Sequence, residues 1–319
     1  MQLISWLEIV GGLALLFAAG EAFVRGAVAL ATRAGVSSLL IGLTIVALGT
    51  SSPEFFVSLE AILSGKAPIA IATVTGSNLI DLTLVLGISA MVAPLVFSRG
   101  RFAFESAVVV GSAALLALLA FAGSIGRVVG TAMVLLVAAY VAASYSRDRR
   151  GRAAGEGWPA EECEEFAPFP RVWPAIGLAV AGLGGLVLGA YLVVAGAEQV
   201  ALGLGASETV IGLTIVAAGS SLPELATSVT AAARGHTDVA IGNVLGSCIF
   251  NILWILGLCA IVRPFAIESA LAKEAILVML GTSVLVSVLL LARSQVGRFA
   301  GAALSLAYAT YVVVFVRAS

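Results

Sequence analysis

One segment of this chain occurs twice: residues 42–95 and 212–265 align without a gap at an offset of 170 residues, with about 23 of 54 positions identical. The shared motifs are GLTIVALGTSSPE (Gly42–Glu54) and GLTIVAAGSSLPE (Gly212–Glu224). Each copy places a glutamate, hydroxyl residues and a proline inside sequence apolar enough to cross a membrane. An internal repeat indicates a fold built from two related units. Duplicated polar residues at membrane depth indicate that something polar passes through the bilayer.

The composition is that of a membrane protein. Hydrophobic residues make up 61% of the chain and charged residues 11%, against roughly 25% charged residues in soluble domains. The net charge of −1 gives no basis for nucleic-acid binding. Apolar runs long enough to span a bilayer are predicted at 4–31, 38–63, 69–94, 103–122, 126–146, 173–202, 209–232, 239–262, 271–292 and 298–316.

The predicted fold is therefore an all-α polytopic membrane protein with ten transmembrane helices. Residues 1–147 form the first five-helix unit, residues 148–172 form a connector, and residues 173–319 form the second unit. Because five is odd, the second unit enters the membrane from the opposite side, so the repeats are inverted. Inverted repeats are typical of secondary transporters, whose site lies between the repeats near the midplane.

Lys and Arg residues favour one orientation in the plasma membrane. With both termini outside, the cytoplasmic loops hold eleven of these residues and the outer loops five. The positive-inside rule therefore places the connector in the cytoplasm. The N-terminus lacks the basic start and small-residue cleavage site of a signal peptide, so we expect the first apolar run to be a retained helix.

The repeated motif predicts a polar stripe on one helix face in each half. Residues at intervals of three or four share a helix face. In 38–63 these are Ala47, Thr50, Ser51, Glu54 and Ser58, and in 209–232 they are Ala217, Ser220, Ser221, Glu224 and Ser228. A charge at the centre of a spanning helix costs about 2.5–3.5 kcal/mol on insertion scales. A cost met at two equivalent positions indicates function.

Pro53 and Pro223 strengthen this interpretation. Proline has no backbone N–H, so the carbonyl four residues earlier, at Gly49 or Gly219, loses its helical partner. Irregular backbone at membrane depth is tolerated where it is buried in protein or lines a cavity. The motif thus offers a carboxylate, hydroxyls and loosened carbonyls, the all-oxygen shell that hard cations such as Ca²⁺ prefer.

A second pair of helices adds further oxygen ligands. Four-residue steps place Thr73, Ser77 and Asp81 on one face in the first copy, and Asn243, Ser247 and Asn251 in the second. If the repeats face each other, Glu54, Asp81 and Glu224 converge with hydroxyl and amide oxygens. Such a pocket suits one divalent cation or a few monovalent ones, as an exchanger requires.

These paired motifs resemble the α-repeats of the cation/calcium antiporter superfamily, most closely those of prokaryotic ten-helix sodium/calcium exchangers. The resemblance implies that Glu54 and Glu224 ligate Ca²⁺ and compete with Na⁺ for it. It implies that the remaining ligands are hydroxyl, carbonyl, amide and carboxylate groups of Ala47, Thr50, Ser51, Ser77, Asp81, Ala217, Ser220, Ser221, Ser247 and Asn251.

Four positions depart from the family pattern. Asp81 and Asn251 are exchanged relative to the usual arrangement, which mirrors the charge, so we expect exchange to survive with altered preference among sites. Thr73 stands where Asn is usual, and Cys248 stands where the first copy has Asn78. These departures bear on ion selectivity more than on the fold.

The leading hypothesis is Na⁺/Ca²⁺ antiport, without a cofactor, by a protein that could act as a monomer. Proton/calcium antiport and a cation channel remain alternatives. An intramembrane enzyme is disfavoured because the sequence has no Ser-His or Cys-His pair. His236 and Glu60 are expected at the surface or interface, and Glu21 and Glu198 near helix ends.

Overall fold

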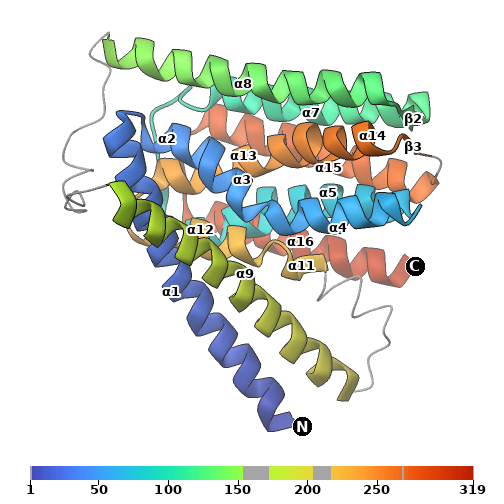
Figure 1. Cartoon of the computed structure of the whole chain (residues 1–319), viewed down its shortest axis with the longest axis horizontal. Coiled ribbons are helices and arrows are strands. Elements are labelled where there is room, and N and C mark those ends of the chain that lie inside the picture. The colour runs from blue at the N-terminus through green and yellow to red at the C-terminus, as the bar shows by residue number, and fades with distance from the viewer. Residues whose placement is uncertain (1, 154–171, 204–216, 268, 319) are drawn as a thin grey trace.

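The computed structural model describes residues 2–153, 172–203, 217–267 and 269–318 and is almost entirely helical (Figure 1). The first half comprises α1 (Gln2–Ala34), α2 (Ser38–Ile41), η1 (Gly42–Val46), α3 (Ala47–Thr50), α4 (Ser52–Leu63), α5 (Ala67–Ile80), η2 (Asp81–Val85), α6 (Leu86–Val92), β1 (Leu95–Val96), α7 (Ala103–Ala122), β2 (Ser124–Ile125) and α8 (Arg127–Ala153). The second half comprises α9 (Val172–Gly203), α11 (Ala217–Gly219), α12 (Leu222–Ala233), α13 (Thr237–Phe250), η5 (Asn251–Leu256), α14 (Gly257–Val262), β3 (Phe265–Ala266), α15 (Ala270–Ala292), β4 (Gln295–Val296) and α16 (Arg298–Ala318). The η elements are π-helical turns within longer helices.

Several helices have the length and apolarity needed to cross a membrane. Among the described residues there are seven such helices, or eight when the pair Ser38–Thr50 and Ser52–Leu63, bent by 47°, counts as one span. Arg298–Val314 is a shorter apolar helix, and the predicted span 209–232 lies partly outside the described residues. The structure therefore supports an all-helical membrane protein with several spans.

Two of these spans form the protein core. In the most apolar stretch of Thr237–Val262, 83% of the residues are buried, and in that of Ala67–Val92 the share is 72%, against 28–44% in the other five spanning helices. Polar residues within spanning helices are tolerated where they face the bundle interior. The two most buried spans therefore provide the surroundings in which the polar residues predicted from the sequence can lie.

The two copies of the repeat fold alike. At the 170-residue offset, α4 matches α12, α5 matches α13 and η2 matches η5, each pair beginning at equivalent residues. Ser37 caps α2, with its Oγ accepting from the Leu40 N–H at 3.1 Å, as its sequence position predicts. Similar local sequences thus give similar local structures in both halves.

Short antiparallel strands join the halves at both ends of the bundle. Strand β1 pairs with β4, and β2 pairs with β3. Exchanging the two halves converts one pairing into the other. At one of these ends, Arg101 also forms an ion pair with Asp238 at 2.6 Å.

Helices α1 and α9 pack against each other along their length and run obliquely to the other helices (Figure 1). Glycine permits the close approach: a Cβ built on Gly182 would lie 2.5 Å from the backbone nitrogen of Phe23. No side chain fits at that distance. This helix pair is therefore held by direct contact between backbones.

Candidate cation site

A break in the helix places Glu54 and Glu224 at equivalent positions. Helix α3 ends at Thr50 and α4 begins at Ser52, with Ser51 between them outside helical geometry (φ −80°, ψ 9°). Ser221 has nearly the same conformation (φ −88°, ψ 6°) before α12. The prolines predicted to disturb the helix lie at the start of each new segment, where a missing N–H costs nothing. Each glutamate therefore sits in the first turn after a break.

The two glutamates receive hydrogen bonds from opposite halves of the protein. Ser51 Oγ donates to Glu224 Oε1 at 3.1 Å, and Ser221 Oγ donates to Glu54 Oε1 at 3.4 Å. Glu54 and Glu224 are 0% and 1% exposed. The two motifs, 170 residues apart in sequence, thus meet in the protein interior.

Neighbouring helices complete this polar layer. Ser77 Oγ also donates to Glu54 Oε1, at 3.3 Å. In the second half, Asn243 Nδ2 donates to Ser228 Oγ at 2.9 Å, and its Oδ1 accepts from Thr50 Oγ1 at 3.2 Å. Helices α5 and α13 therefore support the broken helices with hydrogen bonds as well as packing.

Several buried oxygens in this region have no hydrogen-bond partner among the described residues. They are Glu54 Oε2, Glu224 Oε2, both carboxylate oxygens of Asp81, Ser247 Oγ and Asn251 Oδ1. Buried polar atoms normally have partners, so a group of orphaned oxygens calls for an explanation. All are oxygen ligands of the kind that Na⁺ and Ca²⁺ accept, and the residues present fit a cation that passes through as cargo.

Acidic side chains do not by themselves form a metal site among the described residues. Glu54, Asp81 and Glu224 lie close enough for their negative charges to repel one another. Yet across the described part of the chain, no group of three or more Asp, Glu, His or Cys side chains is arranged to hold a metal ion. Ca²⁺ takes 6–8 oxygen ligands, so the hydroxyl, amide and backbone oxygens would have to supply most of the shell.

Of the other residues predicted for the site, some lie near the glutamate carboxyls and others are engaged within their own helix. Thr50 and Ser220 lie near the two carboxyls, Ser220 beside Glu54 and Thr50 beside Glu224. The Ala47 carbonyl accepts the Ser51 N–H at 3.0 Å and Thr50 Oγ1 at 3.4 Å, so it is engaged within its own helix. Ala217 is the first residue of α11, just as its counterpart Ala47 is the first residue of α3.

Thr73 does not join this polar layer, contrary to the four-residue spacing. It is only partly buried, and its hydroxyl donates to the Ile69 carbonyl of its own helix at 2.9 Å. Asn78 on the same helix is instead buried, with 1% exposure, and donates to the Cys248 carbonyl at 3.1 Å. The sequence did hold a sign that position 78 matters: the two copies differ there, with Asn78 in the first and Cys248 in the second.

His236 corrects a second expectation. The sequence suggested a surface residue, but His236 is 6% exposed and lies at the N-cap position immediately before α13. Glu60 is exposed, as expected. Glu21 binds Arg25 and Arg234, each at 2.8 Å.

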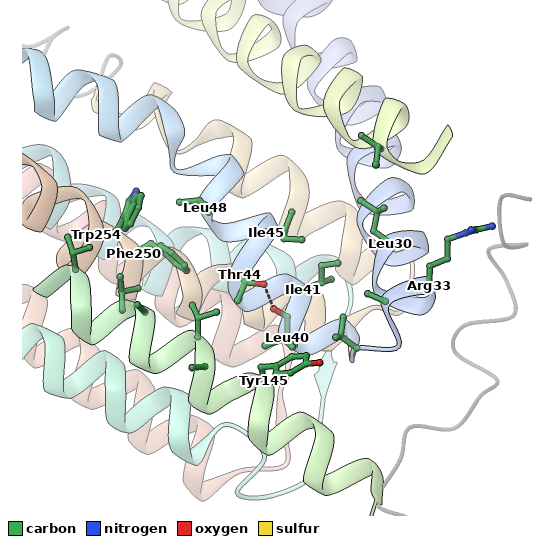
Figure 2. Close-up of a pocket in the computed structure, with 18 of the residues that line it drawn as sticks. Leu30, Arg33, Leu40, Ile41, Thr44, Ile45, Leu48, Tyr145, Phe250 and Trp254 are labelled. Carbon is green, nitrogen blue, oxygen red and sulfur yellow. Dashed lines mark hydrogen bonds between the residues drawn. The ribbon is translucent and has the colours of Figure 1, made fainter. Parts of the chain in front are cut away.

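A separate cavity of about 1170 Å³ lies between α1, α8 and the η1 region (Figure 2). Its wall is largely apolar, with Ile45 and Trp254 among its residues and Arg33 and Tyr145 toward one end. Its one hydroxyl in the η1 turn, that of Thr44, donates to the Leu40 carbonyl at 2.6 Å. A cavity with so few oxygen ligands does not suit a hard cation.

Known proteins match this chain over nearly its whole length. The family model described as sodium/calcium exchanger protein matches residues 4–146 and 174–317. The antiporter candidate CaxA of Alkalimonas amylolytica is 33% identical over 97% of this chain and 98% of its own. Sodium/calcium exchanger MaX1 of Methanosarcina acetivorans is 29% identical, with 98% and 99% covered.

A solved structure shares the fold. The sodium-calcium exchanger NCX_Mj, in crystals soaked without Na⁺ and Ca²⁺, superposes with a TM-score of 0.83 at 28% identity, covering 99% of this chain and 100% of that one. The duplicated motifs, the buried oxygens and these similarities agree. The chain belongs to the sodium/calcium exchanger protein family.

Proposed function

We propose that this protein exchanges Na⁺ for Ca²⁺ by alternating access around Glu54 and Glu224. The observation that carries the proposal is the reciprocal pair of hydrogen bonds, Ser51 to Glu224 and Ser221 to Glu54. Each carboxylate is held by the opposite half of the protein, so relative movement of the halves would change the ligand set. Such a change would couple cation binding to the side of the membrane that is open.

The proposed ligands are those predicted from the sequence, with Glu54, Glu224 and Asp81 carrying the charge. Ser51, Ser77, Ser221, Ser247 and Asn251 are all buried, which supports including them. The hydroxyls of Thr50 and Ser220, and the backbone carbonyls of Ala47 and Ala217, complete the proposed set. No cofactor is needed, because the transported cations themselves neutralise the carboxylates, and a monomer would suffice.

The proposed topology is ten helices in two inverted units in the plasma membrane, with both termini outside. Contacts between the halves support it. The β1–β4 pairing and the Arg101–Asp238 ion pair join loops assigned to the cytoplasm, whereas β2–β3 joins loops assigned to the outside. In this arrangement the connector 148–172 lies in the cytoplasm.

Proton/calcium antiport is the second candidate, favoured by the three neighbouring buried carboxylates. The hydroxyl-rich surroundings of the glutamates favour Na⁺ as the coupling ion. Purified protein in vesicles distinguishes the two. We expect an outward Na⁺ gradient to drive Ca²⁺ uptake, with outward K⁺ and proton gradients ineffective. Uptake driven by protons but not by Na⁺ would replace the proposal, and flux without counter-ion dependence would indicate a channel.

A further inference from the structure

The two copies of the repeat differ at neighbouring positions that the structure brings together. Asn78 corresponds to Cys248, and Asp81 corresponds to Asn251, at the common 170-residue offset. All four residues are buried, with exposures of 0–1%. They lie on α5 and α13 and at the start of η2 and η5.

The hydrogen bonds of Asn78 fix the orientation of its amide. Its Nδ2 lies 3.1 Å from the Cys248 carbonyl oxygen, which can only accept a hydrogen bond. The other end of the amide is therefore Oδ1, and it accepts from Asn251 Nδ2 at 3.0 Å. This bond uses the donor end of Asn251 and turns its Oδ1 away from Asn78.

The other copy has no equivalent bond. Cys248 Sγ approaches the Asn78 carbonyl at 3.9 Å, which repeats the contact that Asn78 makes with the Cys248 carbonyl. A thiol, however, has no second polar end to offer residue 81. An asparagine at 248, bonded to the Asn78 carbonyl through Nδ2, would turn its Oδ1 toward Asp81, another acceptor. Cysteine at 248 therefore suits an aspartate at 81.

We propose that Asn78 is a positioning residue that presents the Asn251 oxygen to the transported cation, and that the Asn78/Cys248 pair sets which repeat carries the charge. The inference rests on the proposed function. On one side of the site, Asn78 bonds to the Cys248 carbonyl and to the Asn251 amide nitrogen, which leaves the Asn251 oxygen available. These two hydrogen bonds are called the clamp below. On the other side the Asp81 carboxylate keeps both oxygens without a partner among the described residues.

Single substitutions test the clamp. Asn78→Leu removes both hydrogen bonds and leaves Asn251 unoriented. We expect the half-saturating Ca²⁺ concentration to rise about five- to 100-fold, the range for a lost buried hydrogen-bond partner, with a smaller change in maximal rate. Thr75→Val is the matched control, because Thr75 is equally buried on α5 but its hydroxyl bonds to Ile71 of the same helix. An equal effect of both variants would overturn the proposal.

Cys248 offers a second test that leaves Asn78 in place. Cys248→Asn sets an amide oxygen against Asp81 and is expected to raise half-saturating Ca²⁺ about tenfold, the equivalent of about 1.4 kcal/mol. Cys248→Ala places no acceptor there. We expect its half-saturating Ca²⁺ concentration to stay within about threefold of that of the unsubstituted protein, a smaller change than the tenfold rise expected for Cys248→Asn. Equal values for the two variants would contradict the assigned role.

Mirroring the site separates positioning from general damage. In Asp81→Asn/Asn251→Asp, the new carboxylate faces the Asn78 oxygen, so this double variant should bind Ca²⁺ weakly. Adding Asn78→Cys and Cys248→Asn transfers the clamp to the other repeat. We expect this quadruple variant to recover at least about tenfold in half-saturating Ca²⁺, or about 1.4 kcal/mol. A quadruple variant no better than the double would refute the inference.

Ca²⁺ binding is also measured without transport, from the rise in melting temperature that a bound ligand causes. If Na⁺ gradients drive no Ca²⁺ flux but Ca²⁺ still stabilises the protein, the proposal of Na⁺/Ca²⁺ exchange fails. The clamp is then tested by whether Ca²⁺ raises the melting temperature of Asn78→Leu less than that of Thr75→Val. If flux is normal and neither readout separates Asn78→Leu from Thr75→Val, the clamp fails and the proposed function stands.

Discussion

At the scale of single residues, the central feature is that each glutamate depends on the other half of the protein. One oxygen of Glu54 accepts from Ser77 and Ser221, and one oxygen of Glu224 accepts from Ser51. The second oxygen of each carboxylate is without a hydrogen bond within the described ranges. Each side chain is therefore held through one oxygen, and its second oxygen is the one that the proposed function assigns to a cation.

Neutralising either glutamate should nearly abolish Ca²⁺ exchange. Glu54→Gln and Glu224→Gln keep the shape but remove the charge that binds a divalent cation. We expect a loss beyond the roughly 10–100-fold seen when an outer partner of a metal ligand is removed. Vesicle uptake measures it, with Glu60→Gln as the control because Glu60 is exposed on the same helix. Normal transport by either variant would disprove the site.

The two serine hydrogen bonds between the halves should contribute about equally to Ca²⁺ binding. Ser51→Ala and Ser221→Ala each remove one hydrogen bond to a buried carboxylate, a bond to a charged group worth about 1.5–3 kcal/mol. We expect a rise of about tenfold or more in half-saturating Ca²⁺ for each variant. Ser52→Ala is the control, since the Ser52 hydroxyl bonds to Leu48 of its own helix. A loss confined to one of the two serines would show that the halves are not equivalent.

At the scale of helices and strands, the breaks before α4 and α12 determine where the motif points. The bend of 47° between the two parts of the second span sets Glu54 at an angle to Thr50 that a straight helix would not allow. The π-helical turns η2 and η5 begin at Asp81 and Asn251. Such turns are frequent at functional sites, and here they begin at the residues that differ between the copies.

Restoring a regular helix should slow transport. Pro53→Ala supplies the missing N–H and favours a straight continuation from α3 into α4. We expect a fall of about tenfold in maximal rate, the equivalent of about 1.4 kcal/mol. Pro68→Ala, at the matching start of α5 and remote from the glutamates, is the control. Unchanged rates in both variants would mean that the break needs no proline.

Packing of α1 against α9 should be sensitive to a single methyl group. Gly182→Ala places Cβ 2.5 Å from the Phe23 backbone, whereas Gly184→Ala in the same helix meets nothing within 4 Å. Overpacking costs about 1–3 kcal/mol, so Gly182→Ala should lower the melting temperature. Gly184→Ala should leave it unchanged or raise it, because alanine favours helix. Equal melting temperatures would contradict the close packing of this pair.

At the scale of the whole molecule, contacts between the halves tie together loops that the positive-inside rule assigns to the same side. Arg263 donates to the Leu63 carbonyl at 2.8 Å on the side assigned to the outside. The Phe97 N–H donates to the Ser294 carbonyl at 2.9 Å on the side assigned to the cytoplasm. These contacts are expected of two inverted units packed face to face.

Labelling of introduced cysteines tests that topology. Ser64, Ser124, Ser98 and Ser294 are exposed. In a Cys163→Ser background, cysteine at Ser64 or Ser124 should react with an impermeant thiol reagent on intact cells. Cysteine at Ser98 or Ser294 should react only after the membrane is opened. Labelling of Ser64→Cys and Ser98→Cys from the same side would exclude the proposed orientation.

The sequence alone predicted the helical membrane fold, the helix breaks and the polar stripe, because apolar runs, prolines and helical spacing act locally. It also predicted that Asp81 and Asn251 would break the symmetry. Spacing misplaced Thr73, since four-residue steps drift around a helix and its hydroxyl finds a partner in its own backbone. His236 was also misplaced, because its exposure of only 6% depends on tertiary packing that a loop position in the sequence does not reveal.

Only the tertiary structure decided which oxygens have partners. Ser51 and Glu224, or Asn78 and Asn251, are separated by 173 residues in the chain, and no local rule specifies their contact. Hydrogen bonds between the halves orient the Asn251 amide and leave one oxygen of each glutamate available. The sequence thus determined which polar groups enter the membrane. Packing of one half against the other determined which of their atoms remain without a hydrogen-bond partner among the described residues, because hydrogen-bond direction depends on partners that only the folded chain brings together.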